Sequence, residues 1–315
     1  MGRAKRALVL TAALVSCAFT TTGPASGVPR TFSGSNGPIA FVRSVGAHGT
    51  LQIFTVLPDG SHVRQVTHGR GNSGAADWSP DGRRIVFQND RTGHDQLYTM
   101  RRDGQGVRRL TRTPPGISDQ FPAYSPDGRL VLFSRCFRNG ICSVYRIGSD
   151  GSHERRLTNA RSQDFEPQFS PDGSRFVFER ITTVHGATTS ALYLMPAGGG
   201  RPQRVTPFAV GAGSPDWSPS GLEIVFESNL TAPHSALFTI HPDGTGLRQL
   251  TDPPSAANDA LASFSPRGSK IVFLSDRTGS GGVWEMNPNG TRLRRVTSSA
   301  SCFACGTDWG VRVLP

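Results

Sequence analysis

The chain has almost no lysine. Lys5 and Lys270 are the only lysines among 34 basic residues, so arginine carries nearly all of the formal net charge of +11. Basic charge alone would favour a nucleic acid or an anionic surface as partner. Many of these arginines, however, recur at one place in the repeat described below, where a solvated strand edge is the favoured interpretation. We therefore expect no nucleic-acid partner.

Short catalytic motifs are also missing. The sequence contains no GxSxG nucleophile elbow, no HExxH and no GKS or GKT phosphate loop. Residues 69–74 fit GxGxxG, but they lie between two expected strands and open no helix, so the dinucleotide interpretation fails. The eight histidines show no metal-ligand spacing. The motif-bearing enzyme classes are therefore not indicated.

The N-terminal apolar run, residues 7–15, is too short to span a bilayer. It follows three positive residues at positions 3, 5 and 6, which is typical of a secretory signal peptide. We predict a signal peptide over 1–25, a Gly/Ser/Thr/Pro-rich linker over 26–36 and an exported protein. Cys17 ends a lipobox-like Leu-Val-Ser-Cys, so two alternatives stay open: a lipid-anchored Cys17 or an ordinary cleavage near Ala25.

The rest of the chain is built from one repeated phrase. In residues 77–87 an aromatic enters the turn Ser-Pro-Asp-Gly, and the apolar run Ile-Val-Phe leaves it. Proline, aspartate and glycine suit the successive positions of a hairpin turn, so the phrase predicts two antiparallel strands. The aromatic recurs at intervals of 45 to 48 residues, at Trp78, Tyr124, Phe169, Trp217, Phe264 and Trp309. A fixed period of this size indicates a repeat architecture.

Each period holds two further strands. A Leu-Tyr-like segment such as 97–98 is followed by an Asp-Gly or Asn-Gly turn and by a closing Leu-Thr such as 110–111. Four antiparallel strands per period, repeated six times, predict an all-β, six-bladed propeller. The first period lacks its opening strand, while residues 307–310 supply one at the other end. We expect the C-terminal strand to close the ring.

The repeats resemble those of TolB-type propellers, relatives of the WD-repeat propellers. The resemblance rests on Asp-Trp-Ser-Pro-Asp-Gly at 77–82, Asp-Arg-Thr-Gly at 90–93 and 276–279, and the closing Arg-Arg-Leu-Thr, and it covers roughly residues 37–315. It implies a single propeller domain over 37–315. TolB proteins carry an additional N-terminal domain, for which we expect no room here. It also implies a binding or scaffold module at the cell envelope.

Five cysteines remain to be placed. Cys136 and Cys142 flank a hairpin connection, and export permits a disulfide between them. Cys302 and Cys305 form a CxxC that could be a redox pair, half of a zinc site or a small structural disulfide. No helix follows the CxxC, so we predict the structural disulfide.

We expect binding on the propeller face that carries the irregular connections, because binding residues concentrate on variable loops of a rigid scaffold. Four arginines recur just after the Ile-Val-Phe strand, and three aspartates precede the strand aromatic. The predicted face comprises Arg91, Arg135, Arg180, Arg277, Asp119, Asp164 and Asp259. If the arginines are free, anionic groups are favoured. If each arginine pairs with an aspartate of the neighbouring blade, the set is structural.

The expected partner is an envelope protein or a small anionic ligand, and we expect a monomer. The alternative is a propeller enzyme of the lactonase, lyase or hydrolase kind, with a metal or acid/base site at the channel mouth. Its candidate carboxylates are the three aspartates just named, with Glu166, Asp77, Asp216 and Asp308. Three such oxygens could hold calcium, whereas the plainer interpretation is that they cap turns and backbone amides.

Overall fold

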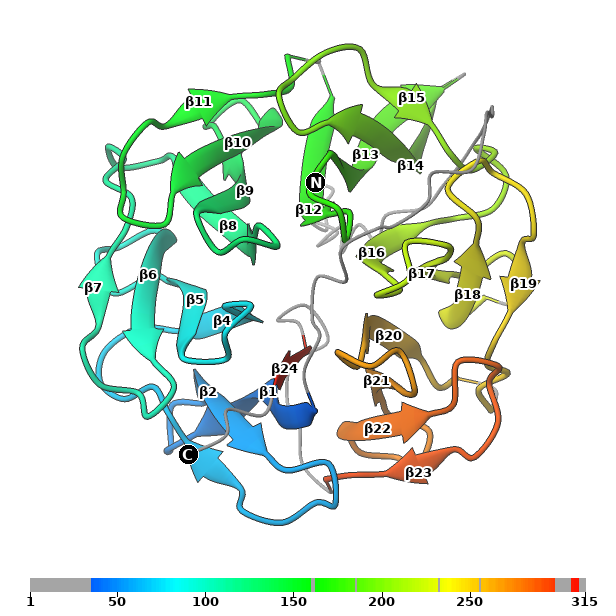
Figure 1. Ribbon diagram of the computed structural model, residues 1–315, viewed down its shortest axis with the longest axis horizontal. Coiled ribbons are helices and arrows are strands. Elements are labelled where there is room, and N and C mark those ends of the chain that lie inside the picture. The colour runs from blue at the N-terminus through cyan, green and yellow to red at the C-terminus, as the bar shows by residue number, and fades with distance from the viewer. Residues whose placement is uncertain are drawn as a thin grey trace, which may run out of the picture.

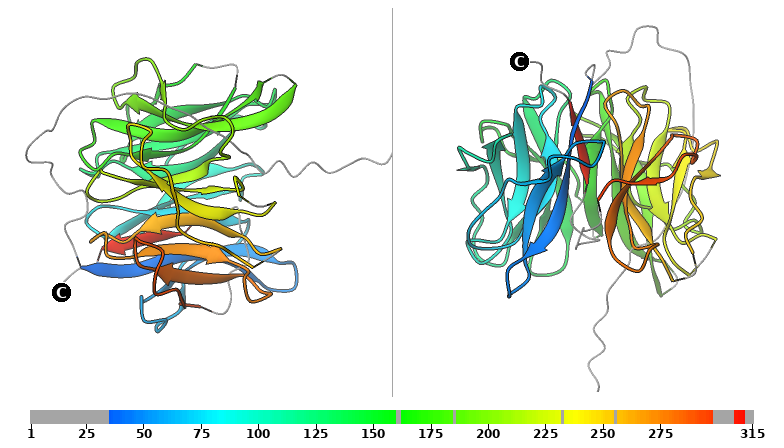
Figure 2. Two further views of the ribbon diagram at one scale, coloured as in Figure 1. Left: turned by 90° about the vertical axis from the view of Figure 1, so that its right-hand side faces the viewer. Right: turned by 90° about the horizontal axis from the view of Figure 1, so that it is seen from below.

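The protein is an all-β propeller. The computed structural model describes residues 35–159, 162–184, 186–231, 233–254, 256–297 and 307–311. These ranges form 24 strands and no helix, and so no helix that could cross a membrane. The sheets stand radially around a central axis, with β4, β8, β12, β16, β20 and β24 innermost (Figure 1). Seen from the side, hairpins and connections gather at the two ends of the ring (Figure 2).

Four sheets have four strands each. From the axis outward, the first sheet is β24 (Asp308–Val311), β1 (Asn36–Val45), β2 (Thr50–Val56) and β3 (Arg64–Gln65). The second is β4 (Ser73–Trp78), β5 (Arg84–Asn89), β6 (Gln96–Arg101) and β7 (Arg108–Arg109). The other two are β16 (Gly213–Trp217), β17 (Ile224–Ser228), β18 (Ala236–Ile240), β19 (Arg248–Gln249), and β20 (Asp259–Phe264), β21 (Ile271–Ser275), β22 (Gly282–Met286), β23 (Arg294–Arg295).

The remaining eight strands form one sheet instead of two. One half is β8 (Ser118–Tyr124), β9 (Leu130–Cys136), β10 (Cys142–Gly148) and β11 (Arg155–Arg156). The other half is β12 (Gln163–Phe169), β13 (Arg175–Val184), β14 (Ala187–Pro196) and β15 (Gln203–Arg204). A single parallel pair, Cys142 with Gln163, joins the halves. The hydrogen-bonded sheets therefore do not number the predicted six.

The repeated Ser-Pro-Asp-Gly phrase closes the turn between the first two strands of a repeat. The Gly82 N–H donates to the Ser79 carbonyl at 2.7 Å, and the Ser79 hydroxyl donates to Asp81 Oδ1 at 2.6 Å. Asp81 Oδ1 also accepts the Arg83 N–H at 3.0 Å, which is the local bonding that makes aspartate favourable in turns. Where the aspartate is Ser220, the Ser218 and Ser220 hydroxyls bond to each other instead.

The closing Leu-Thr explains why the outermost strands are only two residues long. The threonine hydroxyl accepts a backbone N–H of the adjacent strand, as Thr67 does from Ile53 at 2.8 Å and Thr111 from Leu97 at 3.0 Å. The same bond recurs at Thr158, Thr206 and Thr251. A side chain thus satisfies donors that a longer strand would otherwise pair.

Neighbouring repeats are fastened together at the outer rim. Arg108 donates to the carbonyls of Asp150 at 2.7 Å and Ser149 at 3.0 Å, in the next repeat's turn. Arg64 bonds the Asp103 carbonyl and Arg294 the Pro58 carbonyl in the same way. These arginines are exposed, as expected of a solvated edge. They also act as donors between repeats, which the sequence interpretation missed.

The C-terminal strand closes the ring, as predicted. β24 pairs with β1, with Ile39 opposite Trp309 (Figure 1). The Trp309 side chain is buried, and its indole N–H donates to the Gly37 carbonyl at 3.0 Å. One core cluster joins Ile39 and Phe41 to Val272 and Leu274 of β21. The first and last repeats therefore share a core.

Candidate functional site

A channel follows the propeller axis. Two cavities lie along it, one of about 80 Å³ and one of about 40 Å³. Both are lined by the same middle ring: Asp77, Gln168, Asp216, Ser263 and Asp308. The larger cavity lies toward the irregular connections, here called the loop face, and the smaller lies toward the Ser-Pro-Asp-Gly turns, here called the turn face. No basic residue lines either cavity in the part of the chain that the structure describes.

A β-bulge in each innermost strand turns its side chains into the channel. In β4 the register with β5 shifts between Gly74 and Asp77, and Ala75 adopts a φ of 45°. The equivalent residues Phe121, Glu166, Ser214 and Leu261 have φ values between 49° and 54°. A regular strand alternates its sides, whereas the bulge lets Ala75, Ala76 and Asp77 all line one cavity.

The three aspartates of the ring link adjacent repeats. In each case Oδ2 accepts the backbone N–H of the next repeat's aromatic at 2.7 Å: Asp77 from Tyr124, Asp216 from Phe264 and Asp308 from Trp78. This is the interpretation in which carboxylates cap backbone amides. The Ser263 hydroxyl also donates to Asp308 Oδ1 at 3.3 Å, and all three carboxyl groups line both cavities.

Burial and mutual repulsion oppose ionisation of this ring. Burial raises the pKa of Asp77 well above its usual value, and the neighbouring Asp308 raises it further. Burial raises the pKa of Asp216 to about 7 and that of Asp308 to about 6, although both accept backbone N–H bonds that act in the opposite direction. Asp216 and Asp308 are therefore expected to titrate near neutral pH.

A second group of carboxyls lies between β12–β15 and β16–β19. Burial raises the pKa of Glu166, and burial together with Glu166 raises that of Glu179 well above its usual value and that of Glu227 to about 7. Ser190 donates to Glu179 Oε1 at 2.7 Å, and Glu227 Oε2 accepts the Leu261 N–H at 2.9 Å. Glu166 lines the larger cavity, and its Oε2 is buried with no hydrogen-bond partner in the described part of the chain.

Three of the four predicted arginines of the loop face are held by aspartates of their own sheets. Arg135 donates through Nε and Nη2 to Asp119 at 2.7 and 3.0 Å, and Arg180 binds Asp164 in the same bidentate way at 2.7 and 2.9 Å. Arg277 bonds Asp259. The pairing is within one repeat rather than between neighbours, which corrects the structural alternative considered above.

Each of these arginines also covers an aromatic pair of its sheet. The Arg135 guanidinium lies 4.7 Å from the Tyr145 ring centroid, and Arg180 lies 4.7 Å from that of Tyr193. Arg91 pairs with no aspartate in the ranges that the structure describes: it donates to Asn89 Oδ1 and lies 4.6 Å from the Tyr98 centroid. The condition for an anion-binding ring, free guanidinium groups, is therefore not met at Arg135, Arg180 and Arg277.

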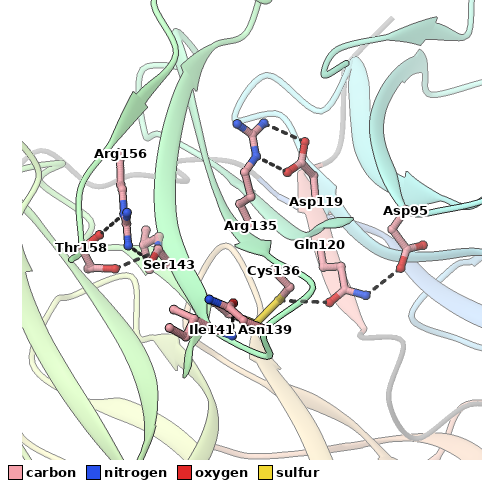
Figure 3. The surroundings of a disulfide bond; sticks show 12 residues. Asp95, Asp119, Gln120, Arg135, Cys136, Asn139, Ile141, Ser143, Arg156 and Thr158 are labelled. Carbon is pink, nitrogen blue, oxygen red and sulfur yellow. Dashed lines mark hydrogen bonds and ion pairs between the residues drawn. A yellow bond between two sulfur atoms is a disulfide. The ribbon is translucent and has the colours of Figure 1, made fainter. Parts of the chain in front are cut away.

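Cys136 and Cys142 form the predicted disulfide across the β9–β10 hairpin. Figure 3 shows it beside the Arg135–Asp119 pair and the Gln120 side chain, which donates to Asp95 at 2.6 Å. Cys17, Cys302 and Cys305 lie outside the described residues. Among those that are described, no three His, Cys, Asp or Glu side chains are arranged to hold a metal ion.

The sequence singled out Asp77, Asp216, Asp308 and Glu166, and the structure brings all four to the channel wall. Asp119, Asp164 and Asp259 are instead fully buried in ion pairs. Sequence reasoning missed Glu179 and Glu227. Both directly follow the Phe of the β-strand that leaves the turn, a position where the other repeats have Val42, Gln88, Ser134 and Leu274. A charged residue at a position that is uncharged in the other repeats is the sequence signal that could have pointed to Glu179 and Glu227.

The repeats are similar to those of known proteins. Residues 180–308 match the model of the TolB beta propeller domain. A "Protein TolB homolog" of Chlorobium luteolum is 30% identical over 267 residues, covering 85% of this chain and 58% of that protein. An uncharacterized protein, Atu1656, of Agrobacterium fabrum is 33% identical over 144 residues, covering 42% of this chain and 48% of its own. The chain thus spans about half the length of these relatives.

Among solved structures, TolB from Acinetobacter baumannii superposes with a TM-score of 0.72 at 21% identity, covering 90% of this chain and 68% of that one. At this identity the likeness concerns the fold alone.

Proposed function

Because the chain folds into a TolB-type β-propeller, we propose that it is a binding or scaffold module whose partner docks on the loop face, over the channel mouth. The observation that carries this proposal is the channel wall, where Asp77, Asp216, Asp308 and Glu166 meet with no basic residue among the described lining. Burial and mutual repulsion disfavour the ionised form of these carboxyls, and a cationic group of the partner would stabilise that form by pairing with it. The proposed partner group is therefore cationic.

The proposed architecture has six blades. It treats the eight-stranded sheet as two blades that touch through one parallel pair. Comparable single contacts connect other repeats, such as the Asp119 N–H with the Asp95 carbonyl and the Asp259 N–H with the Ser235 carbonyl, both at 2.9 Å. The joint between β10 and β12 is then a slightly closer version of an ordinary contact between blades.

The proposed setting is the cell envelope, and the proposed partner is an envelope protein. The N-terminal features at 1–25 favour export. The Cys136–Cys142 disulfide supports an oxidising compartment. Lipid anchoring through Cys17 and the monomeric state remain predictions. Small anionic ligands are less well supported at the loop face, because its arginines are paired.

Site-specific photo-crosslinking tests where the partner docks. A photoreactive phenylalanine analogue would replace Phe121, which lines the cavity toward the loop face. The matched control would replace Val107, which is 43% exposed and directly precedes the outermost strand β7. We expect one envelope protein to crosslink from position 121 in intact cells and not from position 107.

Two results would contradict the proposal. Crosslinking from Val107 at the same or higher yield would move the docking surface to the rim. Absence of any protein crosslinked from position 121, with the folded variant present at the wild-type level, would leave the channel mouth without a protein partner.

A second candidate is acid/base catalysis in the channel, and the raised pKa values of Asp216 and Glu227 favour it, since catalytic carboxyls are tuned in this way. This second candidate function includes calcium binding by the ring carboxylates. A metal assay on purified protein and turnover screens on lactone and uronate substrates distinguish it from the scaffold. Turnover that is lost in Asp216→Asn would replace the scaffold proposal with the enzyme.

A further inference from the structure

A larger cavity lies on the turn face, away from the channel mouth. It has a volume of about 560 Å³ and lies between β4–β7 and β8–β11. Small-molecule sites typically enclose about 300–1,000 Å³. Its inner walls are the two Ser-Pro-Asp-Gly turns at Asp81 and Asp127, and its outer wall is Arg108 with the Ser149 and Asp150 carbonyls it binds. The walls of the cavity are therefore turns and side chains that are already fixed by hydrogen bonds within and between the two repeats.

Tyr124 gives this cavity an unsatisfied polar group. The residue is only 6% exposed, and its hydroxyl oxygen is buried without a hydrogen-bond partner among the described residues. The equivalent residues of the other repeats are Trp78, Phe169, Trp217, Phe264 and Trp309, none of which carries a hydroxyl. A phenylalanine would fill the same place without the cost of an unpaired buried hydroxyl. The hydroxyl is thus not required by the fold.

Two arginines, Arg84 and Arg108, line the same cavity as Tyr124. Burial raises the pKa of Tyr124 and the charges of Asp77 and Asp81 raise it further, whereas the charges of Arg84 and Arg108 lower it. Arg108 is engaged with two carbonyls, but no hydrogen bond or ion pair involves the Arg84 guanidinium in the described ranges. A guanidinium beside a hydroxyl donor is a common arrangement for binding a carboxylate.

Negative charge lies at the rim of the same cavity. Asp81 and Asp150 use Oδ1 to hold their own turns, at Arg83 and Ser152, and each has a second oxygen available. The hydroxyl and N–H of Ser152 lower the pKa of Asp150, so this group is ionised at neutral pH. The cavity therefore combines donors around Tyr124 with acceptors at its edge.

We propose that this cavity binds a small zwitterion of the amino-acid class, either a free amino acid or a short peptide. The ligand carboxylate accepts hydrogen bonds from the Tyr124 hydroxyl and the Arg84 guanidinium, and its ammonium group faces Asp81 and Asp150. The site is independent of the channel mouth, so it stands whether or not the proposed partner docks there.

Isothermal titration calorimetry on the full chain tests the proposal. The probes are the twenty common amino acids and glycylglycine, with acetate and methylammonium as the separate halves of the ligand. We expect at least one zwitterion to bind saturably and at least about tenfold more tightly than either half. Free amino acids and glycylglycine distinguish the two sources of the same chemistry.

Two variants locate the binding. Tyr124→Phe removes one hydroxyl and installs the residue that two other repeats use, and Arg84→Gln changes an exposed side chain. Each should weaken binding by about tenfold. Arg175→Gln is the matched control, because Arg175 holds the equivalent strand position and lies over Trp217 instead. No saturable binding by any zwitterion, equal binding by acetate, or wild-type affinity in both variants would overturn the proposal.

Discussion

Adjacent repeats are joined at two places. Acidic side chains join them at the axis, and basic side chains join them at the outer rim. At the axis, Asp77, Asp216 and Asp308 accept backbone N–H groups of the next repeat. At the rim, Arg64, Arg108 and Arg294 donate to carbonyls of the next repeat's turn. The rim arginines are exposed and hydrated, whereas the axial carboxyls share a narrow channel and have raised pKa values.

This difference indicates that the rim arginines serve the fold, whereas the axial carboxyls are available for function. Rim joints carry charge where water stabilises it, so they cost little and add modestly to cohesion. The axial ring concentrates like charges at some cost to stability, although Ala123, Gln168 and Ser263 occupy the same place in other repeats without a carboxyl. The fold therefore tolerates neutral residues there. The acidic positions are the ones that need a functional explanation.

The largest expected effect is at the rim, in Gly104→Ala. Gly104 has a φ of +82°, and an added Cβ would lie 2.3 Å from the Val66 carbonyl oxygen of the neighbouring repeat. Left-handed strain plus this clash should lower the free energy of unfolding by at least about 3 kcal/mol. Gly93→Ala is the control, because Gly93 has a φ of +90° with nothing within 4 Å, and it should cost about 1 kcal/mol. Equal losses in urea unfolding would show that the repeats are not in tight contact at this turn.

At the axis, Asp308→Ala should destabilise more than Asp308→Asn. Alanine leaves the Trp78 N–H without its acceptor, at a cost of about 1–3 kcal/mol. Asparagine keeps an acceptor oxygen and removes the repulsion on Asp77. Urea unfolding of the two variants measures the difference. A larger loss in the asparagine variant would mean that the charge itself stabilises the ring.

The axial carboxyls also predict how stability depends on pH. Their pKa values are raised in the folded state, so the protonated groups contribute stability that is fully present below about pH 4, the pKa range of unfolded carboxyls. This contribution is lost as pH rises through about 6 for Asp308 and about 7 for Asp216 and Glu227. At about 1.4 kcal/mol for each pKa unit, the loss should be a few kcal/mol per carboxyl. Melting temperatures between pH 5 and 8 should fall for the wild type and fall less for Asp216→Asn; identical slopes would refute the raised pKa of Asp216.

The smallest expected effect is Arg108→Ala. The arginine is exposed and its two bonds to backbone carbonyls compete with water, so we expect a loss of about 0.5–1 kcal/mol. Arg83→Ala, an exposed arginine on the same turn face, should be neutral within error. A loss at Arg108 as large as that at Gly104 would remove the distinction between rim charge and rim packing.

The propeller could be predicted from the sequence because the period is explicit. The recurring aromatic, the Ser-Pro-Asp-Gly turn and the Leu-Thr ending each act locally, and each has the expected place in the structure. Ring closure by residues 307–310 followed from the same pattern. The joining of β10 to β12 through Cys142 and Gln163 did not, because a single backbone pair between repeats leaves no trace in side-chain periodicity.

The site was predicted less well. Ligand contact at Arg135 and Asp119 stays a prediction. The structure shows the two side chains as a bidentate pair within one sheet, and sequence cannot tell which neighbour an arginine will reach. The aspartates beside the aromatic were named only as secondary candidates. These aspartates converge because of the bulge at residues such as Ala75. Its φ of 45° could not be predicted from the residue type. The pocket under Tyr124 likewise depends on the distance between two turns.

The most direct test of the account is crosslinking from position 121 in a protein whose ring is neutral. Asp77→Asn, Asp216→Asn and Asp308→Asn together keep acceptor oxygens for the three backbone N–H groups while removing the channel's charge. We predict that this protein stays folded and that its yield of crosslinked partner falls by at least about tenfold relative to the charged ring. An unchanged yield would contradict the claim that the acidic channel recognises the partner.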